Sequence, residues 1–575
     1  MSQRARGSEP DLAERIEVTF EGRPLLARRG ESVAAALTAA GIRSLRETQG
    51  ELRGVFCGMG VCLDCLVTID GVPSQRACMT KIDRPMAIGK QRAWPEVAAA
   101  PAKSEGGLPP LAPDLLVVGG GAAGMTAAAF AAEAGLDTVL VDERTLPGGQ
   151  FYKQAVPGAL DARARDAQFV DGRRLVERLA ASGTVRLAPA EVVSAHAGLR
   201  VVVREAGQLR LVHPKRLLIA TGAYERPWPV PGWTLPGVMT TGAAQTLLRS
   251  YRVLAGHHVV VAGNGPLNLQ VAVELLEAGA KVEAVAELAA PPGWRDVPAI
   301  LRMAASMPEL LSQGLRYRRI LKRAGVPVLP ATRLSAIERH GNALTALLQD
   351  ANGQTRLIEA DAVAMGYGFQ PANEILRMLG AAHRYDVERR QLVTEVSAVG
   401  ETSVEGLYAA GDCTGLQGAH AAAANGAIAA AEIVRSLGQP LTVGQREEAA
   451  IAFRRRADAL RFQRGLWRMY RPAIAASVAL DEAVPLCRCE GVAGTAVSGA
   501  LDHAATAGTL KRATRSGMGR CQGRYCGEAV AMATAGHAHA AADESQRFAP
   551  RPALRPVTIG ELAGLTDTDR VVSRA

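Results

Sequence analysis

The sequence DLLVVGGGAAG, residues 114–124, decides the fold. A short apolar run enters a turn in which three glycines have the G-x-G-x-x-G spacing: Gly119, Gly121 and Gly124. An Ala-rich stretch (Met125–Ala134) and a second apolar run (Thr138–Val141) follow, and Asp142 comes eighteen residues after the last of these glycines. Strand, glycine turn, helix, strand and acid in this order predict a dinucleotide-binding Rossmann unit.

In such a unit, each of these glycine and acidic positions has an expected role in binding the dinucleotide. A helix N-terminus stabilises a pyrophosphate, and residues without a large side chain let the backbone come close to it. We therefore expect the pyrophosphate to lie against Gly119, Gly121, Ala123 and Gly124. We expect Asp142 to bind the ribose hydroxyls, with Glu143 as the neighbouring candidate.

A second βαβ pattern occupies residues 257–287. Gly263 and Gly265 are in place, but Asn268 stands where the third glycine would be. Ala286 occupies the position of the acid, and Glu287 follows it. The pattern favours an inherited Rossmann half that serves as a scaffold or holds another nucleotide, and an NAD(P) site stays open as the alternative.

Composition limits the class of protein. The chain has 575 residues, 48% of them hydrophobic and 21% charged, which excludes wholesale disorder. The net charge of +10 comes mostly from scattered arginines, and the densest basic run is 453–472. That run favours a solvated helix face, with a docking surface for an acidic protein partner or an anionic membrane as the alternative. Since no aromatic stacking platform accompanies it, we do not expect a nucleic acid partner.

The first residues of the chain and its longest apolar runs indicate the cellular compartment. The first residues hold no apolar core of signal-peptide length, and no run of about 18 apolar residues occurs later. We therefore expect a cytoplasmic protein, for which peripheral association with the inner face of the membrane stays open.

Eight of the nine cysteines form two tight groups, which in a cytoplasmic chain favours metal binding over disulfides. The first group has the C-x4-C-x2-C spacing of plant-type [2Fe–2S] ferredoxins, with a fourth cysteine downstream. Its residues are Cys57, Cys62, Cys65 and Cys78. Runs at Ile16–Phe20 and Arg23–Ala27 predict a hairpin, and Ser32 can cap a helix that Gly41 ends. This order of elements is that of a β-grasp ferredoxin, with zinc as the alternative occupant of the cysteines.

The second group contains two close pairs of cysteines about thirty residues apart. Its residues are Cys487, Cys489, Cys521 and Cys526. A C-x-C pair is tighter than the spacing usual in zinc knuckles, although zinc stays open on spacing alone. The sequence CRCEGV…LKRATRSGMGRCQGRYC resembles the small helical [2Fe–2S] domain of bacterioferritin-associated ferredoxin, and this resemblance implies a second cluster.

Three further segments resemble the flavoproteins with two dinucleotide-binding domains. They are the loop 147–150 (PGGQ), the strand end 219–222 (IATG) and the segment 411–412 (GD). The resemblance implies FAD in the first Rossmann unit and adds further cofactor-binding residues. These are Gly149, Gln150, Thr221, Gly222, Gly411 and Asp412. The helix expected from about Ala419 would stabilise negative charge on the reduced flavin.

Together, the segments ATGAYERPWPVPGW, GNGPLNLQVA, GDCTG and the C-terminal cysteine group resemble the A-type subunit of opine oxidases, hydrogen cyanide synthase and hydroxyproline dehydrogenase complexes. In several relatives the ferredoxin piece is a separate small subunit, which here looks fused at the N-terminus. The resemblance implies an electron-transfer subunit whose D-amino-acid-oxidase-like FAD partner oxidises an amine, opine or imino acid and passes the electrons on towards an external acceptor. No catalytic residue is assigned in this chain.

Two other functions stay open on the sequence. One is a self-sufficient NAD(P)H-dependent reductase that uses the second Rossmann half, and the other is a non-catalytic protein in which the clusters are structural. A glycine-oxidising complex of the hydrogen cyanide synthase type is a variant of the main hypothesis.

The expected architecture is multidomain α/β. In chain order it comprises a β-grasp ferredoxin domain (1–100), a linker (101–113), a flavoprotein domain (114–440, with its second Rossmann half at about 257–365), a linker helix with a small helical [2Fe–2S] domain (441–545), and a tail (546–575).

Overall fold

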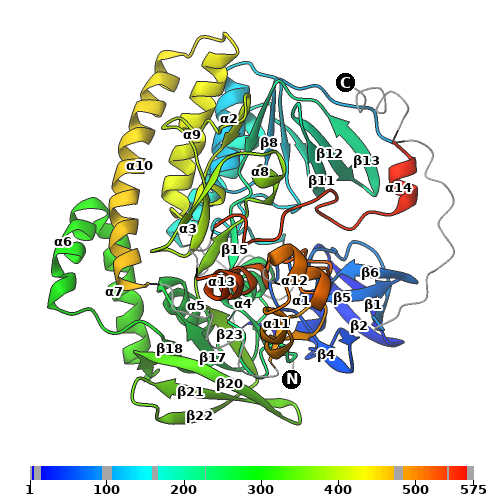
Figure 1. Cartoon of the computed structure of the whole chain (residues 1–575), viewed down its shortest axis with the longest axis vertical. Helices are drawn as coiled ribbons and strands as arrows, with labels where there is room; N and C mark the ends of the chain where they lie inside the picture. The colour runs from blue at the N-terminus through cyan, green and yellow to red at the C-terminus, as the bar shows by residue number, and fades with distance from the viewer. Residues whose placement is uncertain are drawn as a thin grey trace.

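The computed structural model describes residues 3–5, 14–92, 107–157, 166–226, 228–471, 484–504, 506–539 and 543–565. Figure 1 shows the N-terminal domain beside the C-terminal helices α11 (Gly494–Ala500), α12 (Ala507–Thr514) and α13 (Gly527–His537). In this view the sheet that contains β8 (Leu115–Val118) lies above them, and the sheet that contains β17 (His258–Gly263) lies below them.

Residues 14–92 form a domain around a five-stranded sheet in the order β2-β1-β7-β5-β6. Strands β1 and β2 make the predicted hairpin, and β1 pairs in parallel with β7. The Ser32 side chain accepts a hydrogen bond from the Ala35 N–H at the start of α1, as predicted. The domain has the β-grasp order of elements. Their bounds are β1 Arg15–Phe20, β2 Arg23–Arg28, α1 Val33–Ala39, β3 Arg46–Thr48, β4 Glu51–Arg53, β5 Leu66–Ile69, β6 Val72–Arg76 and β7 Ala87–Lys90.

The first Rossmann unit is a parallel sheet in the order β10-β9-β8-β14-β27, with an antiparallel layer β11-β12-β13 beyond it. Helix α2 begins at Ala122, three residues before the predicted start, because Gly124 fits within its first turn. The strands are β8 Leu115–Val118, β9 Thr138–Val141, β10 Val185–Leu187, β11 Ala190–His196, β12 Arg200–Glu205, β13 Gln208–Val212, β14 Arg216–Ile219 and β27 Leu407–Ala409. The helices are α2 Ala122–Glu133, α3 Ala167–Ala181, η3 Asp412–Thr414 and α9 Ala419–Ser436.

The second Rossmann unit has the parallel order β16-β23-β17-β18-β19 and its own antiparallel layer β20-β21-β22. The strands are β16 Val238–Thr240, β17 His258–Gly263, β18 Lys281–Glu287, β19 Val328–Leu329, β20 Thr332–His340, β21 Ala343–Asp350, β22 Thr355–Ala360 and β23 Ala362–Gly366. The helices are α4 Thr241–Tyr251, α5 Pro266–Glu277, η2 Trp294–Asp296, α6 Val297–Ser306 and α7 Pro308–Arg323. Smaller elements join the two units: β15 Ala223–Glu225, β24 Phe369–Pro371, α8 Glu374–Met378, β25 His383–Asp386 and β26 Gln391–Thr394.

Helix α10 (Val443–Met469) lies along α9 and carries most of the basic run seen in the sequence (Figure 1). Arg454, Arg455, Arg461 and Arg464 are exposed on it, which agrees with a solvated helix face. Pro472, at the end of that run, lies outside the described residues.

The C-terminal cysteine group belongs to a small domain of short helices. Its elements are β28 Pro485–Cys487, β29 Val492–Ala493, α11 Gly494–Ala500, α12 Ala507–Thr514 and α13 Gly527–His537. The last described stretch, which ends in α14 (Ile559–Ala563), returns to the first Rossmann unit, where Leu554 is buried in the core beside its sheet.

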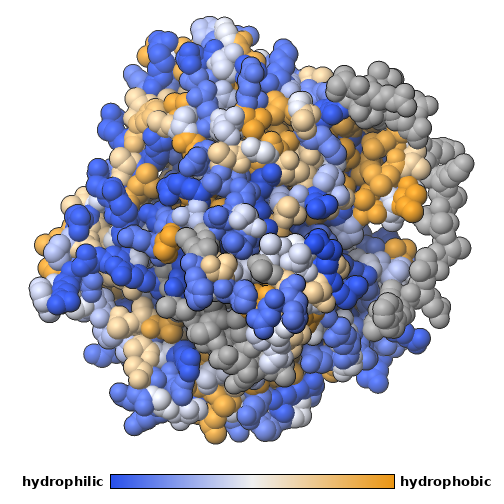
Figure 2. Space-filling view, in the orientation of Figure 1, coloured by the Kyte–Doolittle hydropathy of each residue, from blue (hydrophilic) through white to orange (hydrophobic). Residues whose placement is uncertain are grey.

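In the part of the chain that the structure describes, no helix combines the length and the apolar character needed to cross a membrane. Figure 2 shows hydrophilic and hydrophobic residues interspersed over the face in view.

Candidate functional site

The glycines of the turn after β8 serve two different needs. A Cβ at Gly119 would lie 2.4 Å from the Ala220 carbonyl oxygen, and one at Gly124 would lie 1.8 Å from the Gly119 carbonyl oxygen, so the fold itself requires both glycines. A Cβ at Gly121 would meet only the Gly149 Cα, at 3.9 Å, which is ordinary contact. Gly121 also has φ −83°, so neither its conformation nor its neighbours require glycine. The empty space above it fits a pyrophosphate that approaches the backbone.

Asp142 ends β9 with one carboxylate oxygen satisfied and one available. Its Oδ1 accepts a hydrogen bond from the Arg144 N–H at 3.0 Å, whereas its buried Oδ2 has no partner among the described residues. Burial raises the pKa of Asp142 to about 6. An orphaned acceptor at the end of the second strand fits the hydroxyl donors of a ribose, in agreement with the predicted role.

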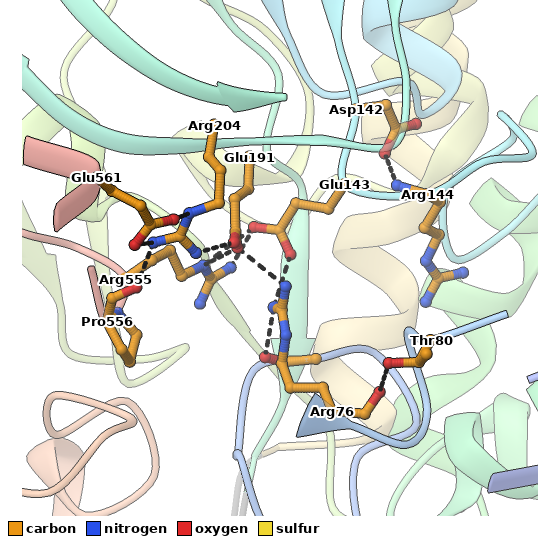
Figure 3. Close-up of polar contacts among 11 residues, drawn as sticks. Arg76, Thr80, Asp142, Glu143, Arg144, Glu191, Arg204, Arg555, Pro556 and Glu561 are labelled. Atoms are coloured by element: carbon orange, nitrogen blue, oxygen red, sulfur yellow. Dashed lines mark hydrogen bonds and ion pairs between the residues drawn. The ribbon is translucent and has the colours of Figure 1, made fainter. Parts of the chain in front are cut away.

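Glu143, the neighbouring candidate for binding the ribose, forms ion pairs within the protein instead. Its carboxylate pairs with Arg555, whose Nε donates to Oε1 at 3.1 Å, and with Arg76, 3.6 Å away (Figure 3). Burial would raise the pKa of Glu143, but the guanidinium groups of Arg555 and Arg76 lower it overall. Glu191 and Arg204 extend this ion network, which joins the N-terminal domain, the first Rossmann unit and the last described stretch. The network favours Asp142 over Glu143 as the ribose residue.

The other segments expected at the flavin surround the same turn. Gly149 (φ +62°) lies against Gly121, and Gly411 (φ +83°) lies against Ala123, where added Cβ atoms would come within 2.8 Å and 3.1 Å of them. Asp412 accepts hydrogen bonds at Oδ1 from the backbone N–H groups of residues 417 and 418 at the start of α9. These contacts bring the four predicted segments together around the N-termini of α2 and α9.

Three more predicted residues lie close by. The Thr221 hydroxyl donates to the Ala372 carbonyl oxygen at 2.6 Å, and Gly222 has φ +71°, a value that favours glycine. The Gln150 carbonyl accepts a hydrogen bond from the ammonium group of Lys153 at 2.5 Å. Burial lowers the pKa of Lys153 to about 7. Sequence reasoning missed this residue because it lies just outside the PGGQ segment.

His420 and Cys413 behave as packing residues. His420 is in the first turn of α9, and its ring contacts the Phe151 ring with a centroid separation of 6.0 Å. Burial lowers the pKa of His420, which keeps the ring neutral at pH 7. Cys413 is completely buried and its thiol lies 3.3 Å from the Ile219 carbonyl oxygen, as expected of a core thiol.

The first cysteine group is organised as two pairs. The Cys62 side chain neighbours that of Cys57, and the Cys65 side chain neighbours that of Cys78. Burial would raise the pKa of Cys57, but hydrogen bonds from Cys62 and from backbone N–H groups, including that of Met59, lower it to about 6. Two pairs of buried sulfurs, with N–H groups pointing at them, fit the two irons of a [2Fe–2S] cluster.

The second group shows the same organisation. The Cys487 side chain neighbours that of Cys526, whose influence lowers the pKa of Cys487 to about 6, and the Cys489 side chain neighbours that of Cys521. Across the described ranges, no three His, Cys, Asp or Glu side chains converge as they would around a single ion. Two neighbouring pairs of sulfurs suit the two irons of a [2Fe–2S] cluster, as in the first group.

The first cysteine group and the segment expected at the flavin line the same cleft. Cys78 and Gly149 line one narrow cleft, together with Lys153 and Tyr251. Gly58, in the loop after the first cysteine, packs on α4, where an added Cβ would lie 3.0 Å from Ala243. The ferredoxin domain therefore presents its cysteines towards the flavin loop.

The turn of the second Rossmann unit is covered by the chain itself. The Asn264 side chain donates to the Arg471 carbonyl oxygen at 3.0 Å, which places the residues after α10 over this turn. Asn268, at the third glycine position, instead bridges the Thr241 hydroxyl and the Gly366 carbonyl. Glu287 folds back and accepts a hydrogen bond from the Gly265 N–H at 3.3 Å, a donor that a pyrophosphate would use. This geometry opposes an NAD(P) site.

Comparison with known proteins places these observations in a family. The family model for pyridine nucleotide-disulphide oxidoreductases matches residues 113–426, and that for a 2Fe-2S iron-sulfur cluster binding domain matches residues 13–93. The chain is 34% identical to the A-type subunit of opine oxidase from Rhizobium meliloti over 463 residues, which are 79% of this chain and 99% of that protein. The chain belongs to the family of opine oxidase A-type subunits. The predicted membership, the FAD-binding oxidoreductase domain and one [2Fe–2S] domain are thereby confirmed.

Hydrogen cyanide synthase of Pseudomonas aeruginosa is also similar to this chain, and two of its subunits match different parts of it. Subunit HcnB is 34% identical over 448 residues, covering 73% of this chain and 93% of HcnB. Subunit HcnA is 47% identical over 68 residues, covering 12% of this chain and 65% of HcnA. This member of the opine oxidase family therefore contains, in one chain, sequence that another enzyme divides between two subunits.

Among solved structures, that of L-proline dehydrogenase from P. horikoshii superposes with a TM-score of 0.70 at 20% identity, covering 98% of this chain and 100% of that one. The two chains share their fold over nearly the whole length.

Replacing Gly121 should separate folding from cofactor binding. We expect Gly121→Val to fold, since its Cβ meets only ordinary contacts, yet to hold less than about a tenth of the wild-type FAD because the side chain fills the pyrophosphate position. Flavin absorbance per chain and the circular dichroism spectrum measure the two properties. Gly314→Ala, in open space on α7, is the control. A Gly121→Val protein with full FAD content would contradict the assignment.

Proposed function

We propose that this chain is the FAD- and iron–sulfur-containing electron-transfer subunit of an amine, opine or imino-acid dehydrogenase complex. It would hold FAD on the first Rossmann unit and two [2Fe–2S] clusters, one on Cys57, Cys62, Cys65 and Cys78 and one on Cys487, Cys489, Cys521 and Cys526. Its domains would follow the boundaries expected from the sequence.

One observation supports this proposal: the segments that we propose for the three cofactors lie next to one another. The flavin loop and Cys78 line one cleft, and the Cys489 sulfur lies 3.8 Å from the Cys62 carbonyl oxygen. A flavin exchanges electrons in pairs or singly, whereas a [2Fe–2S] cluster carries one, so this set of sites suits a junction between a two-electron oxidation and a one-electron acceptor. The protein contributes position and electrostatics.

The oxidation itself would take place on another chain. The relatives are named as subunits, which supports a hetero-oligomer. We propose a partner of the D-amino-acid-oxidase type. Its flavin would supply the acceptor for a hydride from the substrate carbon, while the substrate nitrogen would lose a proton to solvent, so that the C–N single bond would become C=N. The two electrons would then pass to this chain and on to an external acceptor. The imine hydrolyses to the carbonyl product and ammonia or an amine.

The covered turn of the second Rossmann unit is the reason to prefer this function over an NAD(P)H-dependent reductase. Asn264 and Glu287 use the donors and the space that a nicotinamide dinucleotide would need. The electrons must then come from a protein partner.

Co-expression tests the proposed function. We expect this chain together with a D-amino-acid-oxidase-like subunit from the same source to oxidise an opine, a proline derivative or glycine with a redox dye as acceptor, and neither chain alone to show the full rate. A complex that forms and carries its cofactors but oxidises none of these three substrate classes would contradict the proposal.

Ligand substitution tests the two-cluster assignment. Cys62→Ser and Cys489→Ser should each lower the iron content by about half and remove one electron paramagnetic resonance signal, because each cysteine serves one cluster. Cys413→Ser, which changes the buried core thiol, should leave both signals in place. Loss of both signals from either ligand variant, or of neither, would contradict the partition.

A further inference from the structure

The two cysteine groups, more than 400 positions apart in sequence, are in direct contact. Besides the Cys489–Cys62 approach, the Gln49 side chain donates to the Glu490 carbonyl oxygen at 2.6 Å. The indole N–H of Trp233 donates to the Pro485 carbonyl oxygen at 2.8 Å. The loops that carry the cysteines therefore form one interface between the N-terminal and C-terminal domains.

A buried ion pair lies at the centre of this interface. Asp64, between the second and third cysteines of its group, is 1% exposed, and Arg488, between the two cysteines of C-x-C, is 4% exposed. The Arg488 Nε and Nη2 both donate to Asp64 Oδ2, at 2.7 Å and 2.5 Å. Each partner is thus fixed inside a cysteine motif, so the pair sets the separation of the two motifs.

Aromatic rings enclose the guanidinium group. The Arg488 Cζ lies 3.8 Å from the centroid of the Phe56 ring and 4.6 Å from that of Trp233. Its Nη1 donates to the Trp233 carbonyl oxygen at 2.6 Å. This combination of contacts requires arginine. Its planar guanidinium group can stack on the rings, donate twice to Asp64 and donate once to the Trp233 carbonyl, whereas a lysine ammonium cannot make all of these contacts at once.

The local charge balance is positive. Arg46 also pairs with Asp64, at 2.9 Å, and Arg53 is 1% exposed nearby with its charge acting on the same carboxylate. Arg53 itself pairs with Glu51, at 2.6 Å, whose carboxylate is exposed. One buried carboxylate therefore faces three guanidinium groups. A buried excess of positive charge stabilises any neighbouring site that becomes more negative on reduction.

We infer that Asp64 and Arg488 are a positioning pair that holds the two cysteine motifs in contact and makes their iron–sulfur sites direct neighbours for single-electron exchange. The inference rests on the proposed function, in which both groups hold [2Fe–2S] clusters. Such an exchange oxidises one site and reduces the other by one electron, and no bond in the chain forms or breaks. The contact would make the two sites a continuous route across the interface.

Magnetic resonance of the reduced holoprotein tests the contact without reference to turnover. With about four iron atoms per chain, full reduction by dithionite should give an electron paramagnetic resonance spectrum split or broadened by interaction between two neighbouring spins. In half-reduced samples the interaction should weaken, since fewer chains carry two spins.

Two substitutions separate position from charge. Arg488→Gln should remove the spin interaction and, by deleting a buried positive charge, lower the reduced-to-oxidised ratio of the clusters about tenfold at a fixed potential, which is about 59 mV for a one-electron couple. Arg488→Lys keeps the charge but not the fork, so it should weaken the interaction with a much smaller change in potential. If Arg488→Gln does not fold, the lysine variant still decides the test.

The control is Arg249→Gln, which removes another arginine that is only 11% exposed and that joins separate elements through ion pairs with Asp166 and Glu274, neither of which belongs to a cysteine group. It should leave the spin interaction unchanged. Two non-interacting signals in the wild type, or wild-type interaction in Arg488 variants that hold both clusters, would overturn the inference. About two iron atoms per chain would overturn it together with the two-cluster proposal. Four iron atoms and interacting spins, without amine oxidation by the co-expressed complex, would overturn the proposed function alone.

Discussion

The buried ion pair between Asp64 and Arg488 joins the N-terminal domain to the small domain that carries the second cysteine group. An unpaired charge in such a place would be strongly destabilising, since water is excluded and only the partner replaces hydration. Here Arg46 is a second partner of Asp64, and the Trp233 carbonyl and two aromatic faces contact the Arg488 guanidinium group. The arrangement of the two cysteine groups depends on this interaction, and so does the proximity of the sites that they form.

The flavin site depends on a second constraint, the close approach of backbone segments from distant parts of the chain. Gly119 and Gly124 allow the turn to form, whereas Gly121 leaves room for a ligand that the chain itself does not fill. The Glu143–Arg555–Arg76 network then holds the ferredoxin domain against this unit. Its strength comes from burial and from the number of partners, because isolated exposed ion pairs contribute little.

Much of this organisation could be predicted from the sequence, because its motifs depend on local spacing. The glycine turn, the acid at Asp142, the plant-type cysteine spacing and the Ser32 cap each occupy a short segment. The structure has the predicted cap at Ser32 and the predicted helix after the glycine turn. Glu143 was a candidate of equal type to Asp142 by sequence, and only the guanidinium groups of Arg76 and Arg555 distinguish the two.

What sequence reasoning missed involves contacts between distant segments. Asp64 and Arg488 stand inside recognised cysteine motifs, but nothing in either motif states that they meet. The cover over the second Rossmann turn likewise depends on where α10 ends, since Asn264 binds the carbonyl of Arg471. Such pairings follow from the packing of domains, which spacing within one segment does not encode.

In the proposed function, electrons reach this chain from a protein partner and not from a nicotinamide cofactor. The most direct measurement is an anaerobic titration of the purified chain, loaded with flavin and iron, with NADH and NADPH while its flavin absorbance is followed. We predict that neither cofactor bleaches the flavin, whereas dithionite does. Rapid bleaching by NADH or NADPH would contradict the claim, and would make the second Rossmann unit a working nicotinamide site.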